Sequence, residues 1–227
     1  MNMVLETVLE PKFLDTSHGF RPRRGCHTAL ETVRSWKGVP WIIEGDIKSF
    51  FDSIDHHVLE RLLEKHFKEN RLFWFYWKLV KAGYIEFNKK KRIFIASEVG
   101  VPQGGIVSPL LSNLVLHELD SYMQKLIKER EELSIGEPMS IRNPAYYQLS
   151  SKIQRLKKTD RDELKAALCE RRRTRSTIPN PRCTRLKYVR YADDWLVGVW
   201  GSKSLASELK SDIGCFLQSL KLTLFSP

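Results

Sequence analysis

The sequence predicts an α+β fold, an antiparallel sheet with helices packed on one face, on three observations. Two apolar runs rich in Val, Leu, Tyr and Trp, residues 186–191 and 195–200, are typical of buried strands. The polar break between them, which contains Asp193 and Asp194, predicts a hairpin turn. A third apolar strand is predicted at residues 39–47, and residues 55–68 and 203–220 carry the apolar stripes of amphipathic helices.

Length and composition limit the classes of protein to which the chain can belong. With 227 residues, 42% of them hydrophobic, it is long enough for one large domain or two small ones. No apolar run approaches the roughly 20 residues of a membrane span. Residues 1–13, with Glu6 and Glu10, resemble neither a secretory signal nor a transit peptide. The four cysteines are widely spaced, so we expect no zinc site or disulfide framework, and a reducing compartment fits.

Positive charge is concentrated in the middle of the chain. The net charge of +11 divides into +2 over residues 1–122, +10 over residues 123–190 and −1 over residues 191–227. So local an excess indicates a polyanionic partner, with nucleic acid first, or a solvated surface that is simply basic.

The first half of the chain predicts helices separated by loops. Residues 1–13 predict a short amphipathic helix, and residues 17–25, with three arginines, predict a basic loop that could hold a phosphate or be a plain surface loop. Helices are predicted at residues 28–36, at residues 55–68 with Asp55 as N-cap, and at residues 72–82, the last buried. His56 and His57 do not share a helix face, so we interpret them as surface or capping residues. Residues 84–88 and 93–96 predict a hairpin with a basic tip.

The second half begins with a loop rich in glycine and proline, residues 100–109. It leads into a helix predicted from Ser108, as N-cap, to about residue 128. Paired glycines before a helix let a ligand approach the backbone, but the Lys-Ser/Thr of a P-loop is absent, which disfavours an ATPase. Residues 146–156 and 161–173 predict two helices of an insertion between core elements. A strand is predicted to begin at residues 222–225.

Acidic residues end two predicted strands that are far apart in the sequence. Asp46 ends the strand at residues 39–47, and Asp193 and Asp194 follow the strand at residues 186–191. Taken singly, such acids could be solvated turn formers. If the strands are neighbours, the three carboxylates converge and repel one another unless cations neutralise them. Mg²⁺ prefers oxygen ligands, and two such ions, about 3.5–4 Å apart, can activate a 3′-hydroxyl and stabilise a leaving pyrophosphate. The pattern therefore indicates polymerase chemistry.

Four motifs in a fixed order resemble those of one family. They are Ser17-His18-Gly19-Phe20-Arg21-Pro22, Asp46-Ile47-Lys48-Ser49-Phe50-Phe51-Asp52, Gly100-Val101-Pro102-Gln103-Gly104-Gly105-Ile106-Val107-Ser108-Pro109 and Tyr191-Ala192-Asp193-Asp194. Together they resemble the reverse transcriptase domain of group II intron-encoded proteins, the intron maturases, over nearly the whole chain. The Arg-rich residues 172–191 resemble the organellar branch of that family, and fit retron or defence-associated reverse transcriptases less well.

The resemblance implies an RNA-directed DNA polymerase that uses two Mg²⁺ ions, an RNA template, a DNA primer and dNTPs. Asp46 and Asp193 would be the main metal ligands with Asp194 beside them, and the Ile47 carbonyl would complete one site. Phe51 would be the steric gate against a ribonucleotide 2′-hydroxyl. The other implied contacts are Arg21, Arg24, Gln103 and Gly104 for the incoming nucleotide, and Pro102, Gly105 and Tyr191 for the primer or template.

The resemblance also implies a right-hand polymerase palm with partial fingers and no thumb. Residues 1–122 would be partial fingers and the first half of the palm, residues 123–185 a basic helical insertion, and residues 186–227 the second, truncated half of the palm. The family binds its host group II intron RNA and assists splicing, with residues 123–190 as a candidate surface. Two alternatives stay open: an RNA-binding maturase fragment without polymerase activity, or an inert remnant. We expect a mitochondrial location, encoded in the organelle, or else the bacterial cytoplasm, with no membrane.

Overall fold

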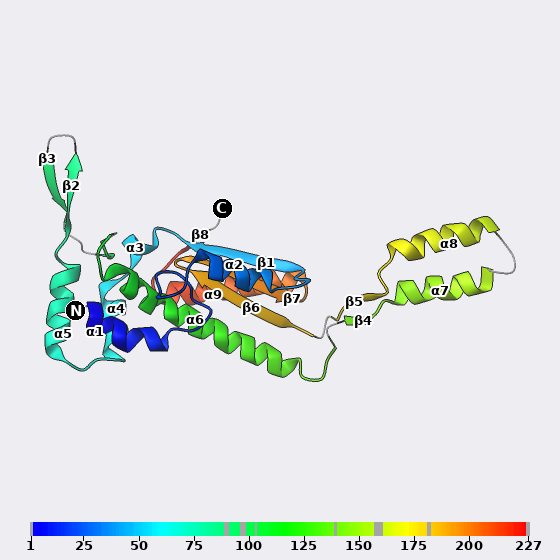
Figure 1. Cartoon of the computed structure of the whole chain (residues 1–227), viewed down its shortest axis with the longest axis horizontal. Helices are drawn as coiled ribbons and strands as arrows, with labels where there is room; N and C mark the ends of the chain where they lie inside the picture. The colour runs from blue at the N-terminus through cyan, green and yellow to red at the C-terminus, as the bar shows by residue number, and fades with distance from the viewer. Residues whose placement is uncertain are drawn as a thin grey trace.

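The computed structural model of the chain describes residues 2–88, 91–95, 99–102, 104–138, 140–156, 161–180 and 183–225, with the backbone alone at residues 84–88, 91–95 and 179 (Figure 1). Within these residues, no helix is both long enough and apolar enough to cross a bilayer. The four cysteines, all of them described, are free thiols, as expected.

A four-stranded antiparallel sheet forms the centre of the molecule, with strand order β6-β7-β1-β8. Strand β6 is Arg185–Tyr191, β7 is Asp194–Trp200, β1 is Trp41–Ile47 and β8 is Leu224–Phe225. The hairpin of β6 and β7 runs from Arg185 opposite Trp200 to Tyr191 opposite Asp194. Strand β7 also pairs with β1, from Trp41 opposite Val199 to Gly45 opposite Trp195. The predicted hairpin and third strand are confirmed, and they are neighbours.

One face of this sheet carries the main hydrophobic core. Alternate residues of each strand point into it, as the period of two in a strand requires. They pack against helices α6 (Ser108–Leu133) and α9 (Lys203–Ser219), with α1 (Asn2–Leu9) and α4 (His56–Glu64) completing the layer. Helix α9 contributes Leu209, Ile213 and Leu217, which are spaced four residues apart and fully buried. Burying a side chain of this size stabilises the fold by roughly 1.5–3 kcal/mol. The strand residues in the core are Ile43, Ile47, Leu186, Tyr188, Trp195, Val197 and Val199.

The other face of the sheet is partly covered as well. Helix α2 (Cys26–Arg34) packs there, where Ala29, Trp36 and Val189 form a small second cluster. The prediction of helices on one face is therefore incomplete. Glycine at position 198 leaves room for Trp36, whose ring carbons would lie 3.0 Å from an added Cβ.

Two parts of the chain project from this body (Figure 1). At one end, α5 (Asn70–Val80) leads to the hairpin of β2 (Tyr84–Asn88) and β3 (Lys91–Ile95). At the other end, a ribbon of β4 (Ser140–Arg142) and β5 (Thr177–Pro179) carries α7 (Pro144–Leu156) and α8 (Arg161–Arg173). We call residues 140–179 the helical arm. Helix α6 continues past residue 122, and Leu126 and Ile127 still pack on the core, so the arm is shorter than the expected insertion.

Three local predictions need correction. Ser108 is the first residue of α6 and not its N-cap, because its hydroxyl donates to the Pro102 carbonyl oxygen at 2.7 Å. His56 is buried, with its Nε2 2.6 Å from the Gly100 carbonyl oxygen, and is not a surface residue. Helix α5 is not buried as a whole, since Trp74 and Phe75 are about half exposed. Asp55, by contrast, is confirmed as an N-cap: its carboxylate accepts from two backbone N–H groups of α4 at 2.9 Å.

Candidate active site

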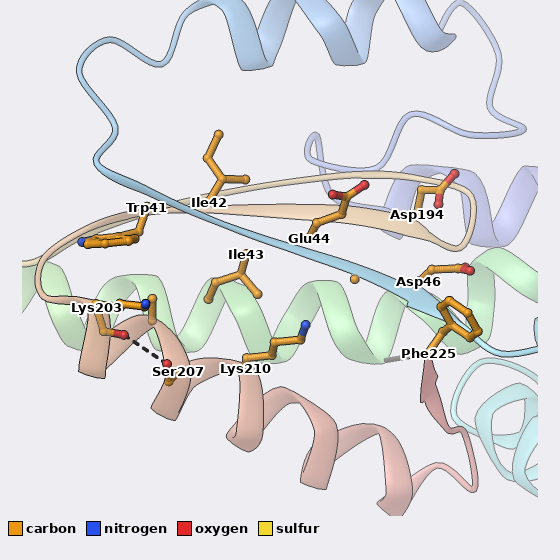
Figure 2. Close-up of a pocket in the computed structure, with 12 residues that line it drawn as sticks. Trp41, Ile42, Ile43, Glu44, Asp46, Asp194, Lys203, Ser207, Lys210 and Phe225 are labelled. Atoms are coloured by element: carbon orange, nitrogen blue, oxygen red, sulfur yellow. Dashed lines mark hydrogen bonds between the residues drawn. The ribbon is translucent and has the colours of Figure 1, made fainter. Parts of the chain in front are cut away.

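The acids singled out in the sequence meet at one end of the sheet. Gly45 pairs with Trp195 at the end of the β1–β7 register, and Asp46 and Asp194 are the adjacent residues of the two strands. Asp193 occupies the turn between β6 and β7. Figure 2 shows Asp194 and Glu44 projecting from the sheet, with Asp46 at the end of β1 beside Phe225. The two acid-bearing strands are therefore neighbours, as the expected convergence of the carboxylates requires.

The electrostatics of this end of the sheet are those of a crowded set of carboxylates. The pKa of Asp194 is raised, first by burial and then by the negative charges of Asp193, Asp46 and Glu44. Glu44 lies two residues before Asp46, on the same side of β1, and the sequence analysis did not single it out. A cation at this end of the sheet would relieve the repulsion.

These residues fit Mg²⁺ by donor type, since carboxylate oxygens are the ligands that this ion prefers. Asp46, Asp193 and Asp194 would hold it, with the Ile47 carbonyl oxygen, at the end of β1, as a further oxygen donor. Among the described residues, however, no three His, Cys, Asp or Glu side chains are gathered closely enough to form a metal cluster. The side chains would have to turn toward a bound ion.

The packing behind Asp46 depends on the glycine that precedes it. The indole of Trp195 lies across Gly45, and an added Cβ would lie 2.0 Å from Cζ2 of that ring. Both residues belong to the buried side of the sheet. Because Trp195 directly follows Asp194, this contact ties the two acid-bearing strands together.

Phe51 lies in the short helix α3 (Phe50–Ser53), which follows β1. Its ring makes edge contacts with Phe50 and Phe20, at centroid distances of 5.6 and 6.3 Å. The glycine-rich loop is attached beside it, since the Val101 N–H donates to the Phe51 carbonyl oxygen at 2.8 Å. Gly100 must be a glycine there, because its φ is +87° and a Cβ would clash with the α3 backbone.

The rest of that loop forms a tight turn before α6. The Pro102 carbonyl oxygen accepts from the Gly105 N–H at 3.2 Å and from the Ser108 hydroxyl. Gly104 is exposed with φ +84°, and open space surrounds the position of a Cβ. Gln103, the predicted nucleotide contact, lies outside the described residues.

The two arginines predicted to bind the nucleotide are engaged within the chain. Arg21 is almost fully buried and donates to the Glu10 carboxylate and to the backbone carbonyls of Glu10, Phe13, Leu14 and Ser17. Arg24 pairs with Asp15 through its carboxylate and its carbonyl. The structure therefore does not bring either guanidinium to the carboxylates, and their nucleotide contacts stay predictions.

Two hollows adjoin the carboxylates. One, of about 650 Å³, runs along the outer edge of β1 between Trp41 and Asp46, with Lys203 and Lys210 of α9 opposite (Figure 2). The other, of about 360 Å³, lies between α2 and the sheet and is mostly apolar. Tyr191, the predicted primer contact, is 39% exposed and lines this second hollow.

Arg190 and Asp120, neither of which was predicted from the sequence, are both completely buried and paired with each other. The sequence does contain a pattern that marks Arg190 as buried. Leu186 and Tyr188 occupy core positions of β6, so the alternation places Arg190 on the same buried side. A buried arginine needs a partner, and α6 supplies it.

An antiparallel sheet backed by helices, with carboxylates at one end, is the arrangement to set beside known proteins. A family model described as reverse transcriptase (RNA-dependent DNA polymerase) matches residues 1–225, so the chain belongs to the reverse transcriptase family. Membership implies a polymerase palm.

Two of three similar proteins are named for introns. The chain is 40% identical to the group II intron-encoded protein LtrA of Lactococcus lactis subsp. cremoris, over 99% of this chain and 38% of the relative. It is 38% identical to an uncharacterized 91 kDa protein in the cob intron of Schizosaccharomyces pombe, over 99% of this chain and 27% of the relative. It is 33% identical to protein YkfC of Escherichia coli K12, over 99% of this chain and 53% of the relative. The chain therefore spans about half or less of each of these relatives.

Proposed function

We propose that the chain is the catalytic domain of an RNA-directed DNA polymerase that adds dNTPs to the 3′-hydroxyl of a DNA primer on an RNA template. The observation that supports this most directly is that Asp46 and Asp194 lie at the same end of the neighbouring strands β1 and β7, with Asp193 in the adjoining turn, so that the charges of Asp46 and Asp193 act on Asp194. A protein that only needed a stable sheet would gain nothing from acids that repel one another there.

The proposed cofactor is a pair of Mg²⁺ ions. When bound, they would supply the charge that activates the primer 3′-hydroxyl and neutralises the leaving pyrophosphate. Asp46 and Asp193 would hold them, with Asp194 and the Ile47 carbonyl oxygen completing the ligand set. Tyr191 would support the primer end.

Phe51 is proposed as the steric gate that excludes ribonucleotides. Its ring is half-buried and wedged between Phe20 and Phe50, which favours a fixed wall over a mobile side chain. Gln103, Gly104 and the turn from Pro102 to Gly105 would lie against the nucleotide and template. Arg21 and Arg24 would have to leave their present partners to reach a triphosphate.

The test is primer extension on an RNA template with Mg²⁺. We expect Asp193→Ala to lower the rate at least about 100-fold, which corresponds to ~2.7 kcal/mol of transition-state stabilisation. Asp212→Ala is the matched control, because Asp212 is an exposed acid on α9 and its loss changes the net charge equally. Extension by Asp193→Ala at the wild-type rate would remove Asp193 from the catalytic role.

A second function, binding of a host group II intron RNA in support of splicing, is favoured by the helical arm. Residues 140–180 contain eleven basic residues, most of them arginine, and four acidic residues. The ribbon of β4 and β5 joins the arm to the body (Figure 1). A projecting segment of this charge suits the phosphates of a folded RNA.

The arm can be removed cleanly to test this second function. Ser140 pairs with Pro179 across the ribbon, so a Gly-Gly link can replace residues 140–179. We expect weaker binding to an intron RNA and a shallower dependence of that binding on salt, with extension of a short primer–template retained. Binding without extension by the intact chain would favour the maturase fragment, and neither activity would favour the inert remnant. Because similar proteins include the Lactococcus lactis protein and an uncharacterized mitochondrial protein, ymf11, of Marchantia polymorpha, we propose an organellar or bacterial location.

A further inference from the structure

Arg190 is a buried cation whose five N–H groups all have partners. Its Nε and Nη2 donate to the two carboxylate oxygens of Asp120 at 2.8 and 2.7 Å, in a bidentate pair. Nη2 also donates to the Ser17 hydroxyl at 2.7 Å, and Nη1 to the Asn113 side-chain oxygen at 3.1 Å. The fifth bond runs from Nη1 to the carbonyl oxygen of Ala192 at 2.8 Å.

These partners come from three separate segments that meet behind the carboxylate turn. Asp120 and Asn113 belong to α6, Ser17 belongs to the basic loop, and Ala192 is the turn residue directly before Asp193. Asp120 is itself held by the Tyr188 hydroxyl, which donates to it at 2.8 Å. The planar guanidinium is therefore fixed on one edge and presents its remaining donors in a fixed direction.

The turn that receives the fifth bond is in an unfavourable conformation. Ala192 has φ +54°, a left-handed value that a residue with a Cβ adopts only when its surroundings impose it. Gly19 presses on it from the loop, since an added Cβ there would lie 2.2 Å from the Ala192 nitrogen. Gly19 is in turn held by Asn113, whose side-chain N–H donates to its carbonyl oxygen at 2.9 Å. The turn is thus clamped between Gly19 and Arg190.

We propose that Arg190 is a positioning residue, which holds the Ala192 carbonyl and thereby sets the direction in which Asp193 and Asp194 leave the turn. An ion pair needed only for the stability of the core would be complete with Asp120 alone. The bond to Ala192 adds a link between the core and the acidic turn. The metal-binding role of the turn rests on the proposed function, but the conformation of the turn can be measured independently of that function.

The test uses a double variant, Arg190→Met with Asp120→Asn. Replacing a buried ion pair by uncharged side chains of similar volume is often neutral for stability, and the amide oxygen at 120 can still accept the Tyr188 hydroxyl. Hydrogen exchange of the backbone amides of residues 192–195 is measured by NMR in the metal-free chain. We expect exchange about fivefold to tenfold faster at these amides, the size of one lost hydrogen bond, while amides in α9 stay unchanged.

Binding of Mn²⁺, followed by electron paramagnetic resonance, is the second measurement. We expect the double variant to bind Mn²⁺ about fivefold to tenfold more weakly than the wild type, since the carboxylates of a loosened turn must be ordered again. Ser17→Ala is the matched control: it removes another partner of the same guanidinium but leaves the bond to Ala192. Its turn amides and its Mn²⁺ affinity should match the wild type.

The outcomes separate this proposal from the proposed function. Faster exchange at the turn without Mn²⁺ binding by the wild type would contradict the metal site and leave the positioning role standing. Turn amides that exchange alike in the double variant and in Ser17→Ala would overturn the positioning role. Arg190→Lys, which keeps a charge for Asp120 but cannot make five bonds, is a second variant with the same expected effect on exchange. Loss of folding in both variants would also count against it, because the role would then not be separable from the core.

Discussion

At the scale of single residues, Gly45 shows how tightly the acidic end of the sheet is packed. We predict that Gly45→Ala destabilises the fold by about 1–3 kcal/mol, the usual penalty of overpacking, because the added methyl group would meet the indole of Trp195 at 2.0 Å. Urea denaturation measures this change. Gly214→Ala in α9 is the control with the opposite sign: the nearest atom to its Cβ is 3.8 Å away, and alanine favours a helix by about 1 kcal/mol.

The charge of Asp194 leads to a second prediction. Because its pKa is higher in the folded chain than its ordinary value, the folded chain holds that proton more tightly than the unfolded chain does. The ionised form therefore destabilises the metal-free fold, fully so at neutral pH, and this penalty disappears as the pH falls below the ordinary value. We expect Asp194→Asn to raise the free energy of unfolding at pH 7 by less than about 1 kcal/mol for so exposed a group, with a slightly higher thermal midpoint, and to have most of this effect removed at pH 3.5.

Added Mg²⁺ is the control for this prediction. If the penalty arises from crowded carboxylates, Mg²⁺ should stabilise the wild type more than Asp194→Asn at pH 7, because the ion binds only the folded chain. Equal stabilisation of both proteins would show that Asp194 does not face the ion.

Some residues of the site can be predicted from the sequence alone, and others depend on contacts between distant segments. Asp46 and Asp193 stand out because an acid directly after an apolar strand is conspicuous in one dimension. Arg190 is equally charged, yet its role depends on α6, which is distant in sequence and supplies Asp120. Glu44 escapes for a similar reason: its field on Asp194 exists only because β1 and β7 are neighbours.

At the scale of elements, the helical arm has the smallest core. Ile153 of α7 and Ala167 of α8 are its buried apolar residues among those described. We predict that Ile153→Ala unfolds the arm and leaves the body folded, because truncating a buried isoleucine costs about 2–5 kcal/mol and two paired helices have little else to hold them. Limited proteolysis should then cut within residues 140–179, while the thermal midpoint of the body stays within a degree or two of the wild-type value. A shift of that size corresponds to a change of less than about 1 kcal/mol in the free energy of unfolding.

Ile213→Ala in α9 is the matched substitution in the main core. It should lower the thermal midpoint of the body and leave the arm as resistant to protease as in the wild type. A lower midpoint of the body after Ile153→Ala would mean that the arm and the body unfold together.

The ends of a helix can be predicted from the sequence where the residues that begin and end it mark them locally. Residues 161–173 form α8 with the predicted ends, because charged residues begin and end a short periodic run. Helix α6 extends to Leu133, about a turn beyond its predicted end. The exposed side of α5 was not predictable in this way: aromatic content indicates that a helix has a partner, but not which of its faces is covered.

At the scale of the whole molecule, the fold is held together by long-range packing onto a single sheet. Three histidines, His18, His66 and His117, sit where that packing is tight, and the pKa of each is lowered, chiefly by burial. Within the structure as described, Nε2 of His18 and Nδ1 of His117 are buried without a hydrogen-bond partner. Protonation of these rings is therefore disfavoured in the folded chain, and this penalty is absent in the unfolded chain.

This makes the folded molecule sensitive to mild acid. Between pH 6.5 and the lower folded values, the unfolded chain binds protons that the folded chain does not, so stability is lost as the pH falls through that window. Each histidine contributes at most about 1.4 kcal/mol per pH unit. We expect the free energy of unfolding, measured by urea denaturation, to fall from pH 7 to pH 5, and His117→Phe to make that fall shallower. His27→Gln is the control, because His27 is exposed and its loss should leave the slope unchanged. A slope that His117→Phe does not alter would place the acid sensitivity at His18 or His66, the other two histidines whose pKa is lowered.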